Sequence, residues 1–193
     1  MGGKNVKDKI IDLLKSTERE GIDNLIEAME QGGFFEAPCS SDKHLCCPGG
    51  LAEHSLNVYS AMVDIDAGLA ADLPEDSIAI CAILHDLGKM GDHGKPNYTE
   101  NILKSGLKSS AKPYSTNKDL IYLPHEIRSA MIAERYIYLS EDEETAILFH
   151  NGLYSTFKNI IPGHEFPLYL ILHTADMYAS RFMEEKDGKV ESD

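Results

Sequence analysis

The pair His85-Asp86 comes directly after a run of seven apolar residues, 78–84, and is followed by Gly88 and Lys89. An apolar run of this kind is normally buried. An ionised aspartate in such a place costs several kcal/mol unless a charge or a metal ion pairs with it. The adjacent histidine makes a metal ion the simplest partner for Asp86, because imidazole and carboxylate groups both bind divalent metals.

A second carboxylate, Asp176, lies in a similar setting within the nearly apolar stretch 168–177. Unpaired buried aspartates are rare, so we expect a metal ion or a charged partner for Asp176 as well. His173 lies three residues earlier on the same helical face, and this spacing allows a hydrogen bond from its ring to the Asp176 carboxylate.

Three more histidines, His54, His125 and His150, fall on predicted helices or helix ends. One such histidine is more often a hydrogen-bonded core residue than a ligand, but two buried carboxylates elsewhere in the chain reverse that expectation. The predicted ligand set is therefore His54, His85, Asp86, His125, His150 and Asp176. It suits one or two divalent ions, from Fe, Mn, Ni, Co, Zn or Mg, and its lack of thiolates disfavours a structural zinc site.

Helical periodicity must position these residues, because strand signals are weak. Helices are predicted over residues 4–18, 22–31, about 51–66, from Pro74 to a stop at Gly88, 125–138, 141–150 and about 165–184. Ser140 and Glu143 fit a capping box. We predict an all-α fold, a single helical bundle with at most a short β-hairpin in the 110–124 loop, formed by residues 121–123 and residues near Tyr114.

The predicted organisation is one domain with an appendage, as expected for 193 residues. Residues 1–36 form two helices packed on the main domain, residues 37–184 form that domain, and residues 185–193 form a flexible tail. The charged composition from Glu184 onward indicates that the helix end frays there.

The loop 90–124 is long and polar, and such loops are usually functional or mobile. It contains five lysines in an otherwise acidic chain, with Tyr98, Tyr114 and Tyr122 among them. Two interpretations stay open: an ordinary solvated loop, or a lid that grips phosphate and stacks on a base.

The net charge of −14 opposes broad binding to nucleic-acid backbones or to anionic membranes. No apolar run approaches the roughly 20 residues that span a bilayer, and the N-terminus lacks an apolar signal core, so we expect a cytoplasmic protein. The four cysteines are expected to be free thiols, with Cys46-Cys47 beside His44 as the alternative place for a zinc or redox site.

The ligand order resembles the HD-domain superfamily of metal-dependent phosphohydrolases over about residues 44–182. Residues 49–58, Gly-Gly-Leu-Ala-Glu-His-Ser-Leu-Asn-Val, resemble its first motif; residues 84–89, Leu-His-Asp-Leu-Gly-Lys, its second; and residues 173–176, His-Thr-Ala-Asp, its last. The resemblance implies an HD-domain-like bundle. It also implies a first metal held by His54, His85, Asp86 and Asp176.

In members with two metals, two further histidines precede the last aspartate, and His125 and His150 match them, with Asp86 as the bridge. His150 is followed by Asn151 instead of a second histidine, and the chain has no Gly-Tyr-Pro motif. This departure argues against cleavage of cyclic dinucleotides.

The resemblance implies hydrolysis of a small phosphorylated substrate, a nucleotide or a related ester or anhydride, by metal-activated water. Asp86 and Lys89 are the expected catalytic residues, with Lys89 on the phosphate; alternatively, Lys89 only interacts with a helix C-terminus. Further expected substrate contacts are His44, His93, Lys95 and Tyr98. The alternatives are a nuclease for short single-stranded RNA or DNA, and a non-catalytic binding or sensor module. The oligomeric state stays open.

Overall fold

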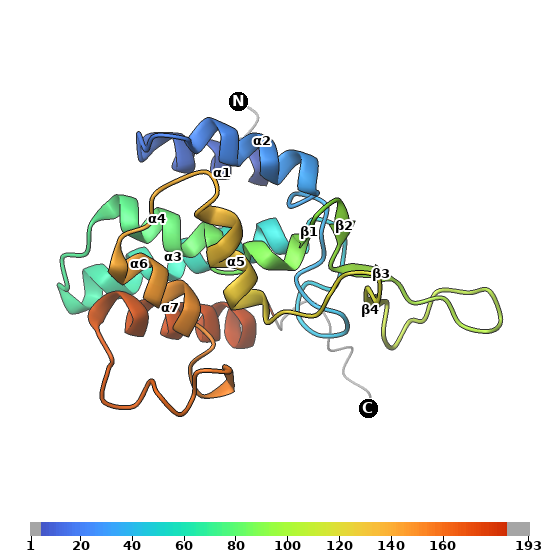
Figure 1. The fold of residues 1–193 in the computed structure, drawn as a ribbon. Coiled ribbons are helices and arrows are strands. Elements are labelled where there is room, and N and C mark those ends of the chain that lie inside the picture. Colours follow the sequence, from blue (N-terminus) through green and yellow to red (C-terminus); the bar gives the residue numbers. More distant parts are fainter. Residues whose placement is uncertain (1–4, 185–193) are drawn as a thin grey trace.

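The structure is a computed structural model that describes residues 5–184. A bundle of helices forms its main body, and small strands and a long protruding loop lie on one side (Figure 1). The α-helices of these residues are α1 (Val6–Ser16), α2 (Ile22–Gly32), α3 (Gly50–Leu69), α4 (Glu75–Leu84), α5 (His125–Ala133), α6 (Glu141–Phe149) and α7 (Pro167–Tyr178). This architecture confirms the predicted all-α bundle.

Shorter elements complete the fold. Two 3-10 helices, η1 (Leu87–Met90) and η2 (Gly152–Tyr154), follow α4 and α6, and a π-helical turn, η3 (Ala179–Met183), extends α7. The strands form two antiparallel pairs: β1 (Gly91–Asp92) with β2 (Lys95–Pro96), and β3 (Tyr98–Glu100) with β4 (Tyr114–Thr116).

The predicted hairpin has a different partner from the one expected. Tyr114 belongs to β4, but its strand pairs with β3, in a register that places Tyr98 opposite Thr116. Residues 121–123 form no strand. The Ile121 carbonyl instead accepts a hydrogen bond of 2.7 Å from Arg128 Nη2, which draws this segment onto the first turns of α5.

Two helix ends also differ from the prediction. Helix α5 stops at Ala133, five residues before the predicted end, because the chain then turns and buries Ile137 and Leu139 outside the helix. Helix α4 ends at Leu84 with His85 as its C-cap, so Gly88 is not the stop.

Gly88 allows the backbones of η1 and α5 to lie close together. A Cβ atom at this position would lie 2.5 Å from the carbonyl oxygen of His125, and the Gly88 amide donates a 2.8 Å hydrogen bond to Ser129 Oγ. Because no side chain separates the two backbones, the start of α5 can lie against the turn that carries Asp86.

Helix α4 is the centre of the core. All of its residues from Ser77 to Leu84 are buried, and it packs against α3, α6 and α7. Helix α1 packs against both α3 and α4, and Ile10, Leu14 and Leu25 of the first two helices join the same hydrophobic core. The His-Asp pair is therefore deep in the molecule, at the end of the most buried helix. The predicted tail, residues 185–193, lies outside the described residues.

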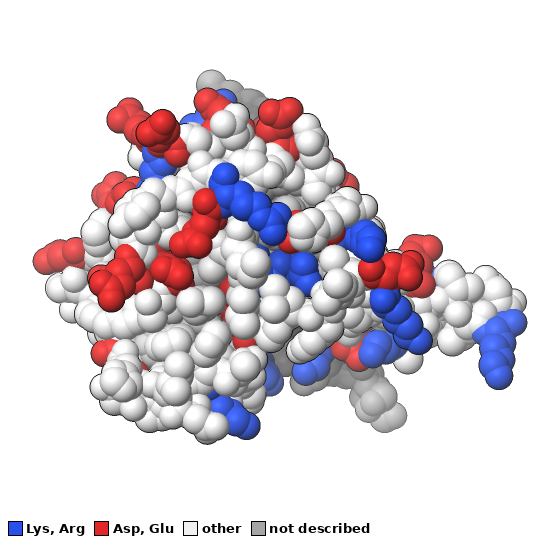
Figure 2. Space-filling view, viewed as in Figure 1, with Lys and Arg blue, Asp and Glu red and all other residues white. Residues whose placement is uncertain are grey.

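Charged side chains are unevenly distributed on the face drawn in Figure 2: acidic residues gather over the helices, and basic ones lie toward the protruding loop. Among the helices of residues 5–184, none combines the length and the apolar character that a membrane-spanning segment needs.

A buried ion pair joins the first helices to α6 and gives a stability prediction. Glu143 is fully buried, completes the predicted capping box with Ser140, and accepts hydrogen bonds from Arg19 (2.7 Å) and Ser77 (2.7 Å). Glu143→Ala would leave Arg19 with Asp76 as its remaining carboxylate partner and Ser77 without its acceptor, so we expect a loss of about 1.5–3 kcal/mol in the free energy of unfolding. Chemical denaturation measures it, with Glu141→Ala as the control; equal, small losses in both variants would contradict the prediction.

The stabilisation by the Glu143–Arg19 ion pair should depend on pH. Burial by itself raises the pKa of Glu143, but the hydrogen bonds from Arg19, Ser77 and Ser140 outweigh it and hold the pKa below the usual 4.5. A carboxyl group with a lowered folded-state pKa stabilises the fold above its unfolded pKa and loses that contribution as the pH falls. The stability difference between wild type and Glu143→Ala should therefore shrink below about pH 4.5.

Candidate metal centre

Five helices and their ends bring the six predicted ligands to one place. His54 lies on α3, Asp176 lies on α7, and His85 and Asp86 follow the last residue of α4. The other two come from helix ends: His125 begins α5 and His150 follows α6. All six side chains meet within the bundle, and four of them, His54, His85, Asp86 and His150, are at most 1% exposed.

The first group of donor atoms comes from α3, α4 and α7. His54 Nε2 lies 3.2 Å from His85 Nε2 and 3.2 Å from Asp176 Oδ1. One ligand atom from each of these three residues lies within 4.8 Å of the others, close enough to share a metal ion.

Asp86 connects this group to a second one. Its Oδ2 lies 3.3 Å from His85 Nε2 and 3.5 Å from His54 Nε2. Its Oδ1 lies 3.1 Å from His125 Nε2 and 3.5 Å from His150 Nε2. Each carboxylate oxygen therefore faces a different pair of imidazole nitrogens, as a bridge between two cations requires.

Backbone carbonyls set the orientation of two rings. His85 Nδ1 donates to the Ala82 carbonyl at 2.9 Å, and His150 Nδ1 donates to the Ile147 carbonyl at 2.7 Å. When Nδ1 carries the proton of a neutral ring, Nε2 presents a lone pair, here toward Asp86. Burial lowers the pKa of His85, which favours that neutral ring.

The surroundings of the Asp86 Oδ1 atom indicate whether a metal ion fits this site. It is buried and accepts no hydrogen bond from residues 5–184, although two imidazole nitrogens lie close to it. A buried carboxylate oxygen without a donor is costly, whereas a cation between that oxygen and the nitrogen lone pairs would satisfy all of them. The imidazole and carboxylate donors suit Mn, Fe, Co, Ni or Zn. The residues therefore fit a divalent metal ion.

Lys89 is the cation closest to the carboxylate among the described side chains. Its Nζ lies 2.5 Å from Asp86 Oδ2, and only 14% of the side chain is exposed. Burial by itself lowers the pKa of Lys89, but the Asp86 charge outweighs it and raises the pKa well above the usual value. Lys89 is thus charged, and it lines the same cavity as Asp176.

Glu184 was expected to begin a frayed tail, and this expectation is wrong. Its side chain is 1% exposed and lies 3.0 Å from His54 Nδ1, where it also accepts a 3.0 Å hydrogen bond from Asn57. Burial alone would raise the pKa of Glu184, but the hydrogen bond from His54 lowers it.

A carboxylate behind a metal-binding histidine fixes the ring and strengthens the ligand. Glu184→Ala should therefore weaken metal affinity about 10- to 100-fold, measured by competition with a chelating dye. Glu53→Ala is the matched control, because Glu53 is exposed and lines the same cavity. An equal change in both variants would show an effect of net charge and not of the His54 contact.

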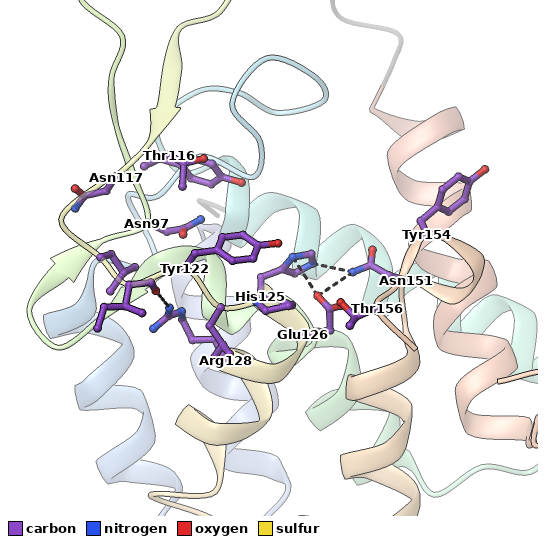
Figure 3. A pocket seen from close by; sticks show the side chains of 15 residues that line it. Asn97, Thr116, Asn117, Tyr122, His125, Glu126, Arg128, Asn151, Tyr154 and Thr156 are labelled. Atoms are coloured by element: carbon purple, nitrogen blue, oxygen red, sulfur yellow. Dashed lines mark hydrogen bonds and ion pairs between the residues drawn. The ribbon is translucent and has the colours of Figure 1, made fainter. Parts of the chain in front are cut away.

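Two residues beside the centre, His173 and Asn151, make hydrogen bonds that the sequence did not predict. His173 does not hydrogen-bond Asp176; its Nδ1 donates to the His150 carbonyl at 2.6 Å, and its ring stacks on Tyr169. Asn151, which the sequence did not single out as a contact, places Nδ2 3.0 Å from His125 Nε2. Figure 3 shows the contacts of this side chain with His125 and with Glu126.

Two cavities flank the centre and share the side chains of Asn151 and Tyr154. The smaller, of about 300 Å³, contains His125, Tyr98 and Tyr122 in its lining (Figure 3). The larger, of about 890 Å³, is lined by Asp176, Lys89, His44, Lys43 and Arg181, among others. Three of the predicted substrate contacts, Lys89, His44 and Tyr98, are thus beside the centre.

His93 and Lys95 are not beside it. They line a different cavity of about 430 Å³ between α2 and the β1–β2 turn. The tight pairing of β1 with β2 turns this segment away from Asp86, and Lys95 Nζ donates to the Asp119 carbonyl at 2.8 Å. Their predicted role in substrate binding has no support from this geometry.

In a comparison with protein families, the model of the HD domain matches residues 51–178. Neither the curated proteins nor the solved structures give a significant match to the chain.

Proposed function

The chain belongs to the HD domain family, a family that includes metal-dependent phosphohydrolases, and from this premise we propose that it hydrolyses a phosphoester or phosphoanhydride bond of a nucleotide. The observation that carries the proposal is the buried Asp86 carboxylate. None of the described residues donates a hydrogen bond to its Oδ1, and an imidazole pair lies beside each oxygen. A divalent cation would satisfy Oδ1, which the contact of Lys89 with Oδ2 does not.

The proposed ligands form two overlapping sets. The first is His54, His85, Asp86 and Asp176, and the second is Asp86, His125 and His150. Divalent ions held there would lower the pKa of a coordinated water and act as Lewis acids toward a phosphoryl oxygen. The chain's own residues would then bind the phosphate, neutralise its charge and hold the ligand rings in place.

Lys89 is the proposed phosphate-binding residue. Its ammonium group faces the larger cavity beside Asp176, and it carries a full charge in a poorly solvated position. A cation so placed stabilises negative charge that develops on the equatorial oxygens during in-line attack at phosphorus. The Glu126 carboxylate, 3.4 Å from His125 Nδ1, would keep that ring turned with Nε2 toward Asp86.

The linings of the two cavities favour a nucleotide. The larger cavity has Lys43, Lys89 and Arg181 for phosphate groups. The smaller cavity has tyrosine rings and the amides of Asn97, Asn117 and Asn151, which suit stacking and hydrogen bonding to a base. Since both cavities adjoin the centre, a nucleotide could place its phosphate over Asp86 and its base among the tyrosines.

Tyr122 gives a test of that placement. Its side chain is 81% exposed in the chain alone and lines the smaller cavity near His125 (Figure 3). Tyr122→Ala should raise KM for a nucleotide substrate about tenfold, equivalent to about 1.4 kcal/mol of stacking, and leave KM for p-nitrophenyl phosphate unchanged. Tyr138→Ala, equally exposed but on another surface, is the control. A parallel rise for both substrates would contradict the base-stacking role.

A nuclease for short single strands is the second candidate. The exposed lysines Lys104 and Lys112 of the protruding loop between β3 and β4, and Lys118 after β4, favour it. The net charge of −14 opposes it. Binding to a strand releases counterions, so nuclease activity should fall steeply with added salt, whereas hydrolysis of a nucleotide should change little.

The proposed function is tested by a panel of nucleotides, dinucleoside polyphosphates and short oligonucleotides, assayed with Mn²⁺, Fe²⁺, Co²⁺, Ni²⁺, Zn²⁺ and Mg²⁺. Phosphate release that needs an added divalent metal and stops with a chelator would support it. Metal binding without turnover of any member of the panel would favour the binding-module alternative.

A further inference from the structure

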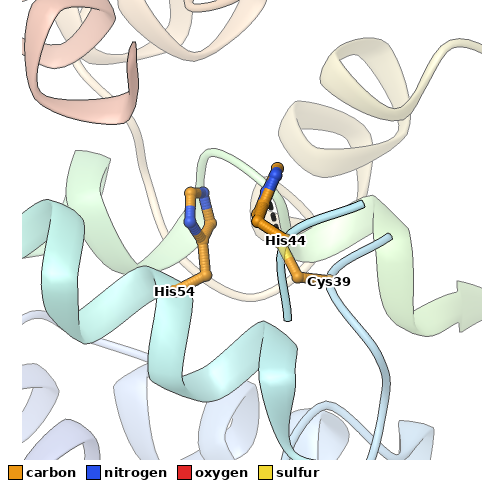
Figure 4. Close-up of side chains that lie close together, drawn as sticks. All are labelled: Cys39, His44 and His54. Atoms are coloured by element: carbon orange, nitrogen blue, oxygen red, sulfur yellow. Dashed lines mark hydrogen bonds between the residues drawn. The ribbon is translucent and has the colours of Figure 1, made fainter. Parts of the chain in front are cut away.

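A buried thiol lies beside the His44 and His54 side chains, next to the metal centre. Cys39 is 0% exposed, in the loop before α3, and its Sγ lies 3.4 Å from His44 Nε2. Figure 4 shows the His44 ring directly beside Cys39, with His54 facing both. The sequence alternative placed a thiol site at Cys46-Cys47 beside His44, but the thiol that contacts His44 is Cys39.

Glu184 closes this group, which we name the thiol cluster: Cys39, His44 and Glu184. Glu184 Oε2 lies 3.9 Å from His44 Nε2, and the same carboxylate accepts from His54 Nδ1. One ligand atom each of Cys39, His44 and His54 lies within 4.8 Å of the other two. The His44 Nε2 atom thus lies 3.4 Å from a sulfur and 3.9 Å from a carboxylate oxygen. The neighbouring His54 ring contacts Glu184 through Nδ1, and its Nε2 faces the metal centre.

We propose that the thiol cluster is a separate site for a borderline-soft divalent cation, zinc or cobalt, held by Cys39 Sγ, His44 Nε2 and the Glu184 carboxylate. Mixed sulfur and nitrogen donors select such cations over magnesium or calcium. Three protein donors leave one position of a tetrahedral ion open, and the cluster adjoins solvent because His44 and Glu184 line the larger cavity.

The protonation states are compatible with this site. Burial raises the pKa of the Cys39 thiol to about 11 and lowers the pKa of His44 to about 4, so without a cation both groups are neutral and the thiol donates to the ring. Binding of the cation would release one proton from the Cys39 thiol to solvent. It would use the lone pair on Nε2 of the neutral His44 ring. Lys89 Nζ, 3.8 Å from Sγ, stays paired with Asp86 and favours the thiolate by its charge.

Occupation of this site would affect the metal centre. Glu184 would turn from His54 Nδ1 toward the cation, so His54 would lose the carboxylate that fixes its ring. Zinc in excess should then weaken binding at the centre, which makes the thiol cluster an inhibitory site.

Cobalt(II) tests the proposal, because thiolate ligands give it an intense near-ultraviolet charge-transfer absorption that imidazole and carboxylate ligands do not. The full chain, reduced and freed of metal, is titrated with Co²⁺. Wild type should show the band and bind about one equivalent more than Cys39→Ser, which should lack the band. His44→Ala should also lose it, and serves if Cys39→Ser does not fold.

Two controls separate this site from the metal centre and from other thiols. Cys81→Ser changes another buried thiol and should keep the band. His85→Ala removes a donor from the centre but none from the thiol cluster, so it should bind less cobalt and still show the band. A band that is absent from wild type, that survives in Cys39→Ser or that disappears in His85→Ala would overturn the proposal. None of these results bears on phosphohydrolysis, which is measured separately.

Discussion

Replacing Asp86 with alanine should reduce kcat/KM for the nucleotide substrate by at least about 10³-fold, about 4 kcal/mol of transition-state stabilisation. The reason is geometric: the two oxygens of Asp86 face the two different groups of imidazole nitrogens. Without it, each proposed set of ligands loses its shared carboxylate. Steady-state kinetics and the metal content of the purified variant measure the effect together.

The helices should still form, because Asp86 lies after the last residue of α4 and contributes no apolar side chain to the core. The cost to stability is the loss of the ion pair with Lys89. Circular dichroism should show an unchanged helical signal. Asp64→Ala is the matched control, an exposed aspartate on α3 whose loss should leave activity and metal content at wild-type values. If Asp86→Ala were folded and retained wild-type turnover, the site assignment would be wrong.

Replacing Lys89 with alanine should reduce activity without weakening metal binding, whereas Asp86→Ala should reduce both. We expect kcat to fall about 100-fold, because the phosphate loses its cation, while metal affinity does not fall. The second expectation follows from the 2.5 Å contact: Lys89 competes with metal ions for Asp86 Oδ2, so removing it frees that oxygen. The measurements are kcat at saturating substrate and a metal titration of the same preparation.

Lys95→Ala is the control for Lys89→Ala, since Lys95 is exposed and lines a different cavity. It should be indistinguishable from wild type in both measurements. If kcat of Lys89→Ala were unchanged, Lys89 would not be the phosphate-binding residue and would only pair with Asp86. If the metal affinity of this variant were reduced, Lys89 would not compete with the metal ion for Asp86.

Residue types and spacing predicted much of the candidate centre. A carboxylate placed in a buried apolar stretch needs a partner, and this physical requirement identified both Asp86 and Asp176 without knowledge of the fold. Helix-end positions identified His125 and His150, because the ends of packed helices converge. The structure brings all of these together with His54.

Other contacts depend on tertiary distances that no local pattern encodes. Glu184 looks like the start of a charged tail, yet the π-helical turn after α7 carries it back to the His54 ring. Cys39 looks like an ordinary thiol until the loop before α3 brings it against His44. Periodicity describes which face of a helix is buried, but not what a loop or a helix end will meet.

The 90–124 loop shows the same limit for secondary structure. Its apolar triplet 121–123 has strand-forming residues, but the hydrogen bond from Arg128 to Ile121 draws it onto α5, and the partner of β4 comes from before the protruding loop. Pairing between short strands depends on which segments the helices bring together. His93 and Lys95 were placed at the site for their chemistry alone, and the β1–β2 turn directs them elsewhere.

The most direct test of the account is anomalous scattering from crystals grown with Mn²⁺. We predict one peak among His54, His85, Asp86 and Asp176, and a second on the other oxygen of Asp86, facing His125 and His150. Crystals that hold Mn²⁺ at other positions but show no anomalous density at Asp86 would contradict the metal centre, and with it the proposed hydrolase.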